Sequence, residues 1–390
     1  MILTQCAVCA TELGLSLGKK CGRCSTRYCG PECQVQHWKE GGHDTLCKKI
    51  KKAGGAEQYN ANEKYTEAVF HAAAACAEDT KGQTCFICTQ ALHWKTKEGL
   101  VRGCACRGTA GFAHVSCLAE QAKILFAEAE ENNLDDDVIY ERFSKWYACS
   151  LCEQEYHGVV RCALGWACWK TYLGRPEEDY ARRMAMNALG NGLFEARVPK
   201  DSLSVREAEL SILRRVGAPE ELILATQSNL ASTYEFVGRR EEAATMLRDV
   251  YSGTLKLYGE EHRETLIAAN NYAASLETLQ RYQEARSLLR KTIPVARRIL
   301  GESDRITLTM RKIFATALYE DDSSTLDDLR EAKTTLEESE RTARRVFGGA
   351  HPLVLALKGS MRLAREVLRA REAPEVLQTA DDLAAHFDSL

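Results

Sequence analysis

Apolar and polar residues follow a helical period through the second half of the chain. From about residue 175 onward, apolar positions return every three or four residues, and the strict alternation that strands require is almost absent. The same pattern recurs after 42 residues, so that Gly217, Gly259 and Gly301 occupy equivalent places. A fixed period in this range is typical of stacked repeats, and we therefore predict a helical repeat array over residues 158–390.

Each repeat is predicted to form a helical hairpin. Two amphipathic stretches flank a short break, at residues 237–239 in one repeat and at 279–281 in the next. The following repeat shifts its register by five residues near 321–324, which predicts a longer loop between its two helices. One hairpin cannot bury its own apolar face, so about four to five of them must stack into an α-solenoid.

One polar position recurs once in each of three repeats. Asn187, Asn229 and Asn271 stand 42 residues apart. Because an amide both donates and accepts hydrogen bonds, this row could bind the backbone of an extended peptide. Alternatively, each amide could bond a neighbouring helix and stabilise the stack. Ile313 occupies the next equivalent position, so any such row ends there.

Cysteine is concentrated at the other end of the chain. Fifteen of the 17 cysteines precede residue 153, and 14 of them combine with two histidines into two sets of eight. Each set holds four pairs and a tetrahedral structural zinc takes two, so the sequence predicts two zinc ions per set and four in all. The first set is Cys6, Cys9, Cys21, Cys24, Cys29, Cys33, His43 and Cys47, and the second is Cys85, Cys88, Cys104, Cys106, His114, Cys117, Cys149 and Cys152.

Three cysteines fall outside these sets. Cys76, Cys162 and Cys168 lie in alanine-rich or apolar helical surroundings, and we expect them to be small buried side chains. Disulfides are not expected, since the pair spacings match zinc sites and the total number of cysteines is odd.

Two modules and a connecting segment therefore precede the repeat array. The first cysteine set defines a module over residues 1–52, and the second defines one over 83–157. Between them, residues 53–82 form a linker in which a flexible break at 53–55 leads to a helix over about 62–79.

The second module is expected to contain a helix of its own. Residues 118–131 are rich in alanine and glutamate and predict a helix, and the acidic residues 135–137 predict a turn after it. Trp166 and Trp169 are expected to be buried where this module meets the first repeat.

Charge and hydropathy narrow the classes of partner. The net charge of -3 gives no general attraction to nucleic acid or to anionic membrane. The most apolar stretch, 158–173, is too short to span a bilayer and contains Arg161 and Lys170. The start of the sequence lacks the pattern of a signal peptide. We therefore expect a protein of the cytoplasm or nucleus whose partners are proteins or peptides, not membranes, nucleic acids or small-molecule substrates.

Residues 6–47 resemble a MYND finger. The resemblance is carried by the sequence YCGPECQVQHW at 28–38, followed by His43 and Cys47. It implies that the pairs interleave, although spacing alone leaves open which pairs share an ion. The implied ligand groups are Cys6, Cys9, Cys29 and Cys33 for one zinc, and Cys21, Cys24, His43 and Cys47 for the other.

The MYND resemblance also implies a surface that binds proteins. Fingers of this family commonly bind proline-containing peptides, and Gln34 and Trp38 match positions that line such a surface. His37 matches a neighbour of this surface and not a metal ligand.

The second set resembles the RING-CH variant of the RING domain. The resemblance is carried by Cys104-Ala105-Cys106, by the seven-residue gap to His114 and by Tyr156 after the last pair. The PHD finger, a reader of histone tails, has the same ligand order and stays an alternative, although Tyr147 stands where that family has tryptophan. The implied groups are Cys85, Cys88, His114 and Cys117 for one zinc, and Cys104, Cys106, Cys149 and Cys152 for the other.

The RING resemblance implies a protein that positions a reaction without performing it. RING domains hold a ubiquitin-conjugating enzyme with its thioester in a reactive geometry, and Ile87 matches a position that contacts this enzyme, unless it packs between zinc loops. Three positions depart from the family pattern: Gln121 replaces a tryptophan, Ser150 replaces a proline, and Glu153 replaces a basic residue.

The repeats resemble the tetratricopeptide repeats of kinesin light chains over about residues 175–370. The resemblance is clearest at 259–266 and at 270–273. Together these features predict a mainly α chain, with two small cross-brace zinc modules followed by an α-solenoid of tetratricopeptide-like hairpins. We expect a ubiquitin-ligase-type adaptor, or else a non-catalytic interaction scaffold, or a histone-tail reader if the second module is PHD-like.

Overall fold

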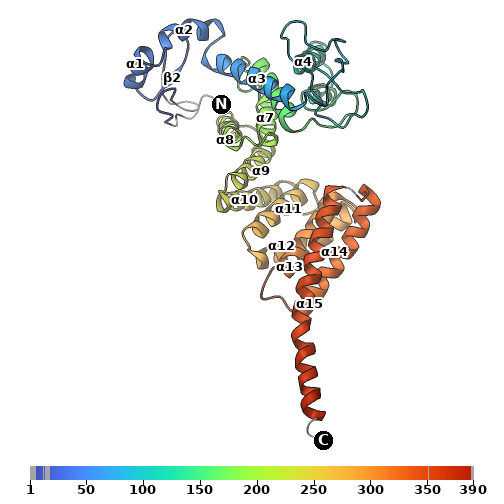
Figure 1. Ribbon diagram of the computed structural model, residues 1–390. Helices are drawn as coiled ribbons and strands as arrows, with labels where there is room; N and C mark the ends of the chain where they lie inside the picture. Colours follow the sequence, from blue (N-terminus) through green and yellow to red (C-terminus); the bar gives the residue numbers. More distant parts are fainter. Residues whose placement is uncertain (1–5, 12, 14–17, 350, 388–390) are drawn as a thin grey trace. The chain divides into compact units, whose positions relative to one another are not determined.

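A computed structural model describes residues 6–11, 13, 18–349 and 351–387, with side chains as far as residue 372. These residues form fifteen helices and two short strands, which confirms the mainly α prediction. The chain divides into two compact units, Met1–Thr226 and Gln227–Leu390. Figure 1 shows the helices of the repeat array following one another through the second half of the sequence.

Cysteines make up half of the buried core of the first module. Strand β1 (Lys19–Lys20) pairs antiparallel with β2 (Arg27–Tyr28), and helices α1 (Pro31–Lys39) and α2 (His43–Lys52) follow. Pro31 opens α1 at a position where its missing N–H leaves no helical bond unmade. The residues buried at the centre are Cys6, Leu13, Cys21, Cys24, Tyr28, Cys47, Ile50 and Ala56.

Helix α3 (Ala56–Ala75) begins and ends earlier than the predicted helix over 62–79. The glycines before it do not form a flexible break. Gly54 and Gly55 have φ of 102° and 113°, and Gly55 N–H donates to the Ile50 carbonyl at 3.0 Å. The Ala56 N–H then donates to the Cys24 carbonyl at 3.0 Å. This bonded turn fixes the start of α3 against the first module.

The second module consists mostly of loops around two helices, α4 (Val115–Glu131) and α5 (Asp136–Ser144). Helix α4 confirms the helix predicted at 118–131. The acidic run at 135–137 was predicted to form a turn, but it begins helix α5 instead. Carboxylates in a first helical turn are stabilised by the unbonded N–H groups there, so this acidic run favours a helix start.

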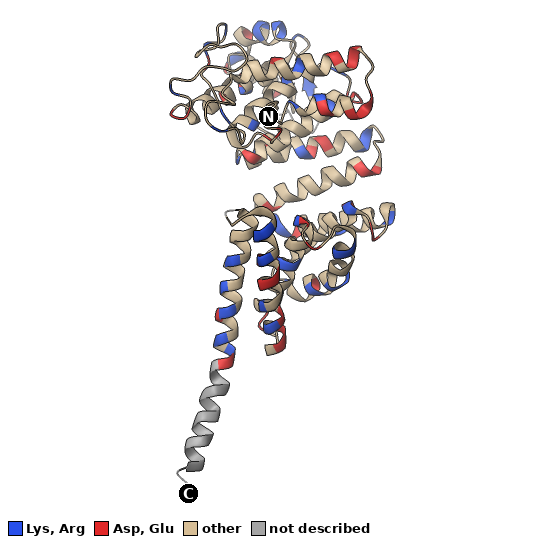
Figure 2. Cartoon of the chain, turned by 90° about the vertical axis from the view of Figure 1, so that its right-hand side faces the viewer, with Lys and Arg blue, Asp and Glu red and all other residues tan. Residues whose placement is uncertain are grey.

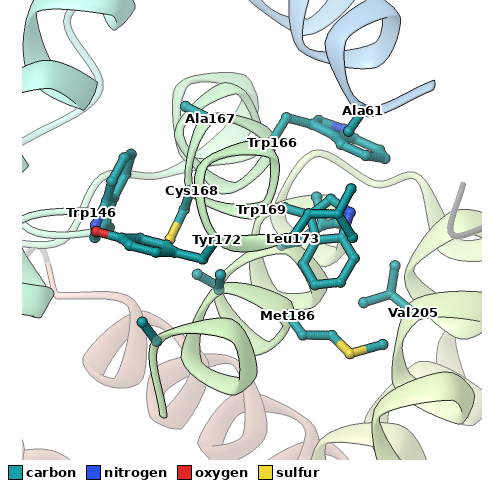
Figure 3. Packing of buried hydrophobic residues seen from close by; sticks show 14 of the residues in the cluster. Ala61, Trp146, Trp166, Ala167, Cys168, Trp169, Tyr172, Leu173, Met186 and Val205 are labelled. Carbon is teal, nitrogen blue, oxygen red and sulfur yellow. The ribbon is translucent and has the colours of Figure 1, made fainter. Parts of the chain in front are cut away.

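Helix α6 (Gly158–Tyr172) links the second module to the first hairpin. Trp166 and Trp169 are 2% and 4% exposed, as expected from the sequence. Trp146 from the second module packs edge-on against Tyr172, with ring centroids 5.8 Å apart. Figure 3 shows these two rings side by side, with the sulfur of Cys168 close to Tyr172. One core therefore continues from the second zinc module into the repeats.

Helices α6 and α7 (Tyr180–Glu195) approach closely at two glycines. A Cβ at Gly165 would lie 3.0 Å from the Ala188 carbonyl oxygen, and one at Gly192 would lie 2.8 Å from the Arg161 carbonyl oxygen. The contact at Gly192 is shorter than real side chains show, so glycine is required there, and a side chain at Gly165 would force the neighbouring backbone to shift.

Hairpins with short breaks fill the rest of the described chain. Gly259 and Gly348 end second helices with φ of 82°, which explains the periodic glycine at this position. Four hairpins and a final long helix agree with the predicted four to five units. The hairpins are α7 with α8 (Pro199–Arg215), α9 (Glu220–Phe236) with α10 (Arg240–Tyr258), α11 (Arg263–Thr278) with α12 (Tyr282–Ile299), and α13 (Arg305–Tyr319) with α14 (Leu326–Phe347), and α15 (Pro352–Phe387) follows.

The loop between α13 and α14 is longer than the earlier breaks, as the register shift predicted. Thr325 ends it with a capping box, in which its hydroxyl accepts from the Asp328 N–H while the Asp328 carboxylate accepts from the Thr325 N–H. Arg286 of α12 is 9% exposed and donates to Asp328 at 2.7 Å, and it reaches Asp321 at 3.5 Å. These bonds tie the loop to the preceding hairpin.

Acidic and basic residues are interspersed along the helices (Figure 2). Among the described residues, no helix combines the length and the apolar character needed to cross a bilayer.

Candidate metal centres and partner surfaces

Each of the four Cys-x-x-Cys pairs in the described chain forms the same backbone turn, which we call a knuckle. In the knuckle at Cys85, the Thr89 N–H donates to the Cys85 carbonyl at 2.8 Å, and the Cys85 N–H donates to the Gln90 carbonyl at 3.0 Å. The residue after the second cysteine has a positive φ, which is 62° at Thr89. This turn holds both sulfur atoms on one side. The equivalent residues in the other knuckles are Ala10, Ser25 and Glu153, with φ of 56°, 63° and 58°.

The sixteen predicted ligands come together in four groups of four. Within each group the candidate ligand atoms all lie within 4.8 Å of one another. The grouping interleaves the pairs in the manner that the two resemblances imply and that spacing alone left open. The groups are Cys6, Cys9, Cys29 and Cys33; Cys21, Cys24, His43 and Cys47; Cys85, Cys88, His114 and Cys117; and Cys104, Cys106, Cys149 and Cys152.

The separations within the groups fit zinc. The sulfur atoms of Cys106 and Cys149 are 3.8 Å apart. A zinc–sulfur bond of about 2.3 Å gives a tetrahedral edge of about 3.8 Å. The Cys88 sulfur lies 3.4 Å from His114 Nδ1, whereas the Cys24 sulfur lies 3.4 Å from His43 Nε2. The two histidines therefore present different ring nitrogens to their groups.

Two members of the third group, Cys85 and His114, have surroundings that favour the forms that bind metal, whereas burial raises the pKa of the Cys117 thiol. Burial raises the pKa of the Cys85 thiol, but backbone hydrogen bonds from Cys88, His114 and Ile87 outweigh it and hold the pKa below its ordinary value. Burial lowers the pKa of His114, and its Nε2 lies 3.4 Å from the Ala91 carbonyl oxygen. A thiolate and an oriented neutral imidazole are the metal-binding states of these side chains.

Gly111 is part of the fourth group's surroundings and was missed by the sequence reasoning. It has a φ of +82°, and a Cβ there would lie 2.6 Å from Cys106 Cβ and 3.0 Å from its sulfur. Any other residue would therefore displace a candidate ligand. The available signal was a glycine in the gap between Cys106 and His114.

Of the two residues expected to bind peptides in the first module, Trp38 lies beside His43. His37 is not in a metal group; its Nδ1 bonds the Tyr28 hydroxyl at 3.0 Å and its ring lies 4.8 Å from that of His43. The Trp38 ring lies 5.8 Å from that of His43 and is 45% exposed. Gln34 is half-buried one helical turn before Trp38. The neighbouring Val35, which was not singled out from the sequence, is 51% exposed.

In the second module, apolar side chains stand at the tips of two knuckles. Ile87 is 37% exposed, and Leu151, at the equivalent place in the Cys149 knuckle, is 52% exposed. Two of the three positions that depart from the family pattern contact each other, since the Ser150 hydroxyl donates to Gln121 Oε1 at 2.9 Å. Glu153 has the positive φ that follows each knuckle. Leu151 and the Gln121–Ser150 bond depend on folded proximity that the sequence does not reveal.

The asparagine row has intramolecular partners at two of its three positions. Asn187 donates to Glu209 at 3.4 Å and accepts from Asn191 at 2.9 Å. Asn271 donates to the Ser228 hydroxyl at 3.3 Å. Asn229 is half-buried. These bonds correspond to the stack-stabilising alternative, and peptide binding by the row stays a prediction.

Three segments of the chain match known families. Residues 6–47 match the MYND finger, 85–134 match the RING-variant domain and 222–298 match the tetratricopeptide repeat. The RING-variant match ends before Cys149 and Cys152, which the fold nevertheless brings into the fourth group. No curated protein matches the chain significantly.

Solved structures resemble part of this chain at low sequence identity. Tetratricopeptide-like repeats of a Podosopora anserina protein described as a putative kinesin light chain are 21% identical, cover 54% of this chain and 98% of their own, and give a TM-score of 0.42. A variant of the same repeats with one substitution gives the same score, with 97% of its own chain covered. BtubC (BKLC) from P. vanneervenii is 13% identical, covers 68% of this chain and 92% of its own, and gives a TM-score of 0.40. The chain thus carries, in order, a MYND finger and a RING-variant domain, which are zinc-binding modules, and tetratricopeptide repeats.

Proposed function

We propose that this protein is a ubiquitin-ligase-type adaptor. Its RING-variant domain would recruit a ubiquitin-conjugating enzyme, while the MYND finger and the repeats recruit proteins to be modified. The observation that carries the proposal is the exposure of Ile87 and Leu151 at the tips of the two knuckles, one from each metal group of the RING-variant domain. Exposed apolar side chains on rigid turns are suited to binding a partner protein.

The zinc ions in this proposal have a structural role. We propose that each of the four groups holds one ion through its four cysteine or histidine ligands. A site with four protein ligands is closed and leaves no position for a substrate or for an activated water. Zinc would then supply the shape of the surface, and the RING-variant domain would contribute positioning.

The MYND finger is proposed to bind a peptide at the surface of α1. The Trp38 ring meets the His43 ring edge-on and is 45% exposed, and the half-buried Gln34 one helical turn earlier offers an amide. A tryptophan face beside an amide suits the flat ring and the free carbonyl groups of a proline-containing segment. Asn187, Asn229 and Asn271 remain candidates for contacts with a peptide along the repeats.

A non-catalytic scaffold is the second candidate. It is favoured by the hydrogen bond between Gln121 and Ser150, which places polar groups where related domains use a tryptophan and a proline. Glu153 also carries the charge opposite to that expected for a contact with ubiquitin. The histone-reader alternative gains no support from the RING-variant match over 85–134.

The two candidates are separated by an activity assay. The zinc-loaded chain is mixed with activating enzyme, a panel of conjugating enzymes, ubiquitin and ATP, and ubiquitin chains are measured. We expect chain formation with at least one conjugating enzyme and a loss of about tenfold or more in Ile87→Ala. Val35→Ala, which removes an exposed apolar side chain from the MYND finger, is the matched control and should retain full activity.

Silence across the panel, with four zinc ions per chain measured in the same sample, would favour the scaffold. If Ile87→Ala and the unmodified chain were equally active, the chain would be a ligase, but Ile87 would not belong to the surface that binds the conjugating enzyme.

A further inference from the structure

The RING-variant domain contains one further turn, at residues 93–98, that has the backbone of a knuckle but no cysteine. The His93 N–H donates to the Glu98 carbonyl at 3.0 Å, and the Lys97 N–H donates to the His93 carbonyl at 2.9 Å. Lys97 has a φ of 61°, as the equivalent residues of the metal-binding knuckles do. His93 and Thr96 occupy the positions of the two cysteines, and their Nδ1 and Oγ1 atoms are 2.8 Å apart. A hydrogen bond therefore closes this turn where a metal would close the others.

The turn presents an aromatic side chain beside a cavity. Trp94 follows His93 and is 67% exposed. The cavity has a volume of about 710 Å³ and lies within the first unit. Its lining comes from the turn, from Tyr65 of α3, from the end of α6 with Lys170, and from one face of α4. The α4 residues recur at helical spacing and are Ser116, Ala119, Glu120 and Lys123.

Lys170 brings a positive charge to this cavity. Its ammonium lies 3.5 Å from the centroid of the Tyr65 ring. No carboxylate among the described side chains lies within ion-pair distance of it, and burial lowers the pKa of Lys170, although the more distant charge of Glu98 opposes this shift. The carboxylate of Glu98 is instead held by Ser116, whose N–H and hydroxyl donate to it at 2.7 and 2.9 Å. A half-buried ammonium in this situation gains free energy when an anionic group binds next to it.

The rim of the cavity is also more basic than acidic. Lys95 and Lys123 stand at the rim with Glu120, and Glu120 lies 3.6 Å from Lys123 in an exposed pair. Exposed pairs of this kind contribute little and exchange partners easily. The cavity therefore offers three ammonium groups against one carboxylate.

We propose that this cavity binds an acidic segment of a partner protein, with a carboxylate at Lys170 and an apolar side chain against Trp94. A peptide is favoured over a nucleic acid because Glu120 at the rim would repel a continuous row of phosphates, as would the net charge of -3. The site does not depend on the proposed ligase activity. Gln121 lies off the cavity-lining face of α4, so the cavity and the proposed enzyme-docking surface use different faces of this helix.

The test is a binding measurement on the full, zinc-loaded chain. The probe is a fluorescein-labelled peptide of Asp, Glu and Leu, and its partner peptide has Asn and Gln in place of the acids. Fluorescence anisotropy should show binding of the acidic peptide, weakening as salt is raised, and much weaker binding of the amide peptide. Lys170→Met should weaken binding about tenfold or more, and Trp94→Ala should weaken it several-fold.

Matched controls are chosen outside the cavity. Lys358→Met removes a half-buried lysine of α15, and Tyr140→Ala removes an exposed aromatic side chain of α5, and both should bind the acidic peptide normally. If Lys170→Met loses zinc, the proposal is tested by Trp94→Ala alone. The Trp94 side chain is exposed, and its removal leaves the hydrogen-bonded turn in place.

Three results would overturn the proposal. The first is no binding of the acidic peptide, or equal binding of the amide peptide. The second is an unchanged Kd in both Lys170→Met and Trp94→Ala. The third is a single-stranded oligothymidylate that binds more tightly than the peptide and depends on Lys170, which would assign the cavity to nucleic acid.

Discussion

The MYND finger and the last hairpins of the array have cores of opposite kinds. In the finger, four of the eight buried residues at the centre are cysteines, with Leu13, Tyr28 and Ile50 as larger apolar members. In the second unit, the core is a continuous column of leucine and alanine in which Leu289 and Leu308 are fully buried. The finger therefore depends on a few bonds to an ion, whereas the array depends on many weak contacts between successive helices.

This difference determines which perturbation each region withstands. Removing the ion from a finger removes most of its stabilising free energy at once, since a segment of this size buries too little surface to fold securely alone. Removing one side chain from the array removes a small share of a larger total.

Zinc removal should separate the two regions most sharply. Zinc contributes roughly 10–16 kcal/mol to a small finger, so a strong chelator should abolish hydrogen-exchange protection in both zinc modules. The helices of the second unit, residues 227–390, should keep their protection. Equal loss of protection in both regions would show that the array depends on the metals too.

A matched pair of substitutions tests the metal groups one residue at a time. Cys149→Ser removes a member of the fourth group and should reduce the zinc content from four ions per chain to three, with loss of structure in the RING-variant domain. Cys168→Ser makes the same chemical change at a buried position outside the groups. It should cost about 1–3 kcal/mol and leave all the zinc bound. Elemental analysis with thermal unfolding measures both effects, and zinc loss from Cys168→Ser would contradict the grouping.

A core truncation tests the array. Leu289→Ala in α12 should destabilise the second unit by about 2–5 kcal/mol without releasing zinc, because it leaves a cavity in a tightly packed column. Leu257→Ala in α10 removes the same side chain at a position that is 41% exposed and should change little. Urea unfolding followed by exchange at α11 to α13 compares the two variants, and similar costs would mean that packing in the column does not decide stability.

The smallest effect is a pH dependence at the long loop. The pKa of Asp328 is lowered by the N–H of Thr325 and further by the hydroxyl of Thr325 and by Arg286. A carboxylate whose pKa is lower in the folded than in the unfolded state stabilises the fold at pH values above its unfolded pKa of about 4. This stabilisation is lost as the pH falls through the lower pKa of the folded state. Asp328→Asn should therefore cost about 1 kcal/mol at neutral pH and progressively less in acid.

The control for that prediction is Asp327→Asn, since the Asp327 side chain is 93% exposed. Its effect should be small at every pH. Native-state hydrogen exchange at α14 measures both variants, and a cost for Asp328→Asn that does not fall in acid would contradict the assigned role of the carboxylate.

The features that the sequence predicted are those fixed by local spacing. The period of 42 residues located the hairpins, and the cysteine pairs located the metal groups, because both depend on residues close together in the chain. The pairing of the groups needed either the family resemblances or the fold, since Cys106 and Cys149 meet across 43 positions of sequence. The bond between Gln121 and Ser150 and the cavity at Lys170 depend on where α4 and α6 pack, which no local pattern encodes.

Helix α6 contributes to two cores at the same time. Val160 and Leu164 are buried with the residues of the RING-variant domain, whereas Trp166 and Trp169 are buried with the first hairpin. Cleavage of the chain between residues 157 and 158 would therefore expose an apolar surface on both products, and each would be prone to aggregate. Cleavage at this junction by a cellular protease would destabilise both parts, so the RING-variant domain and the first hairpin should persist or be degraded together.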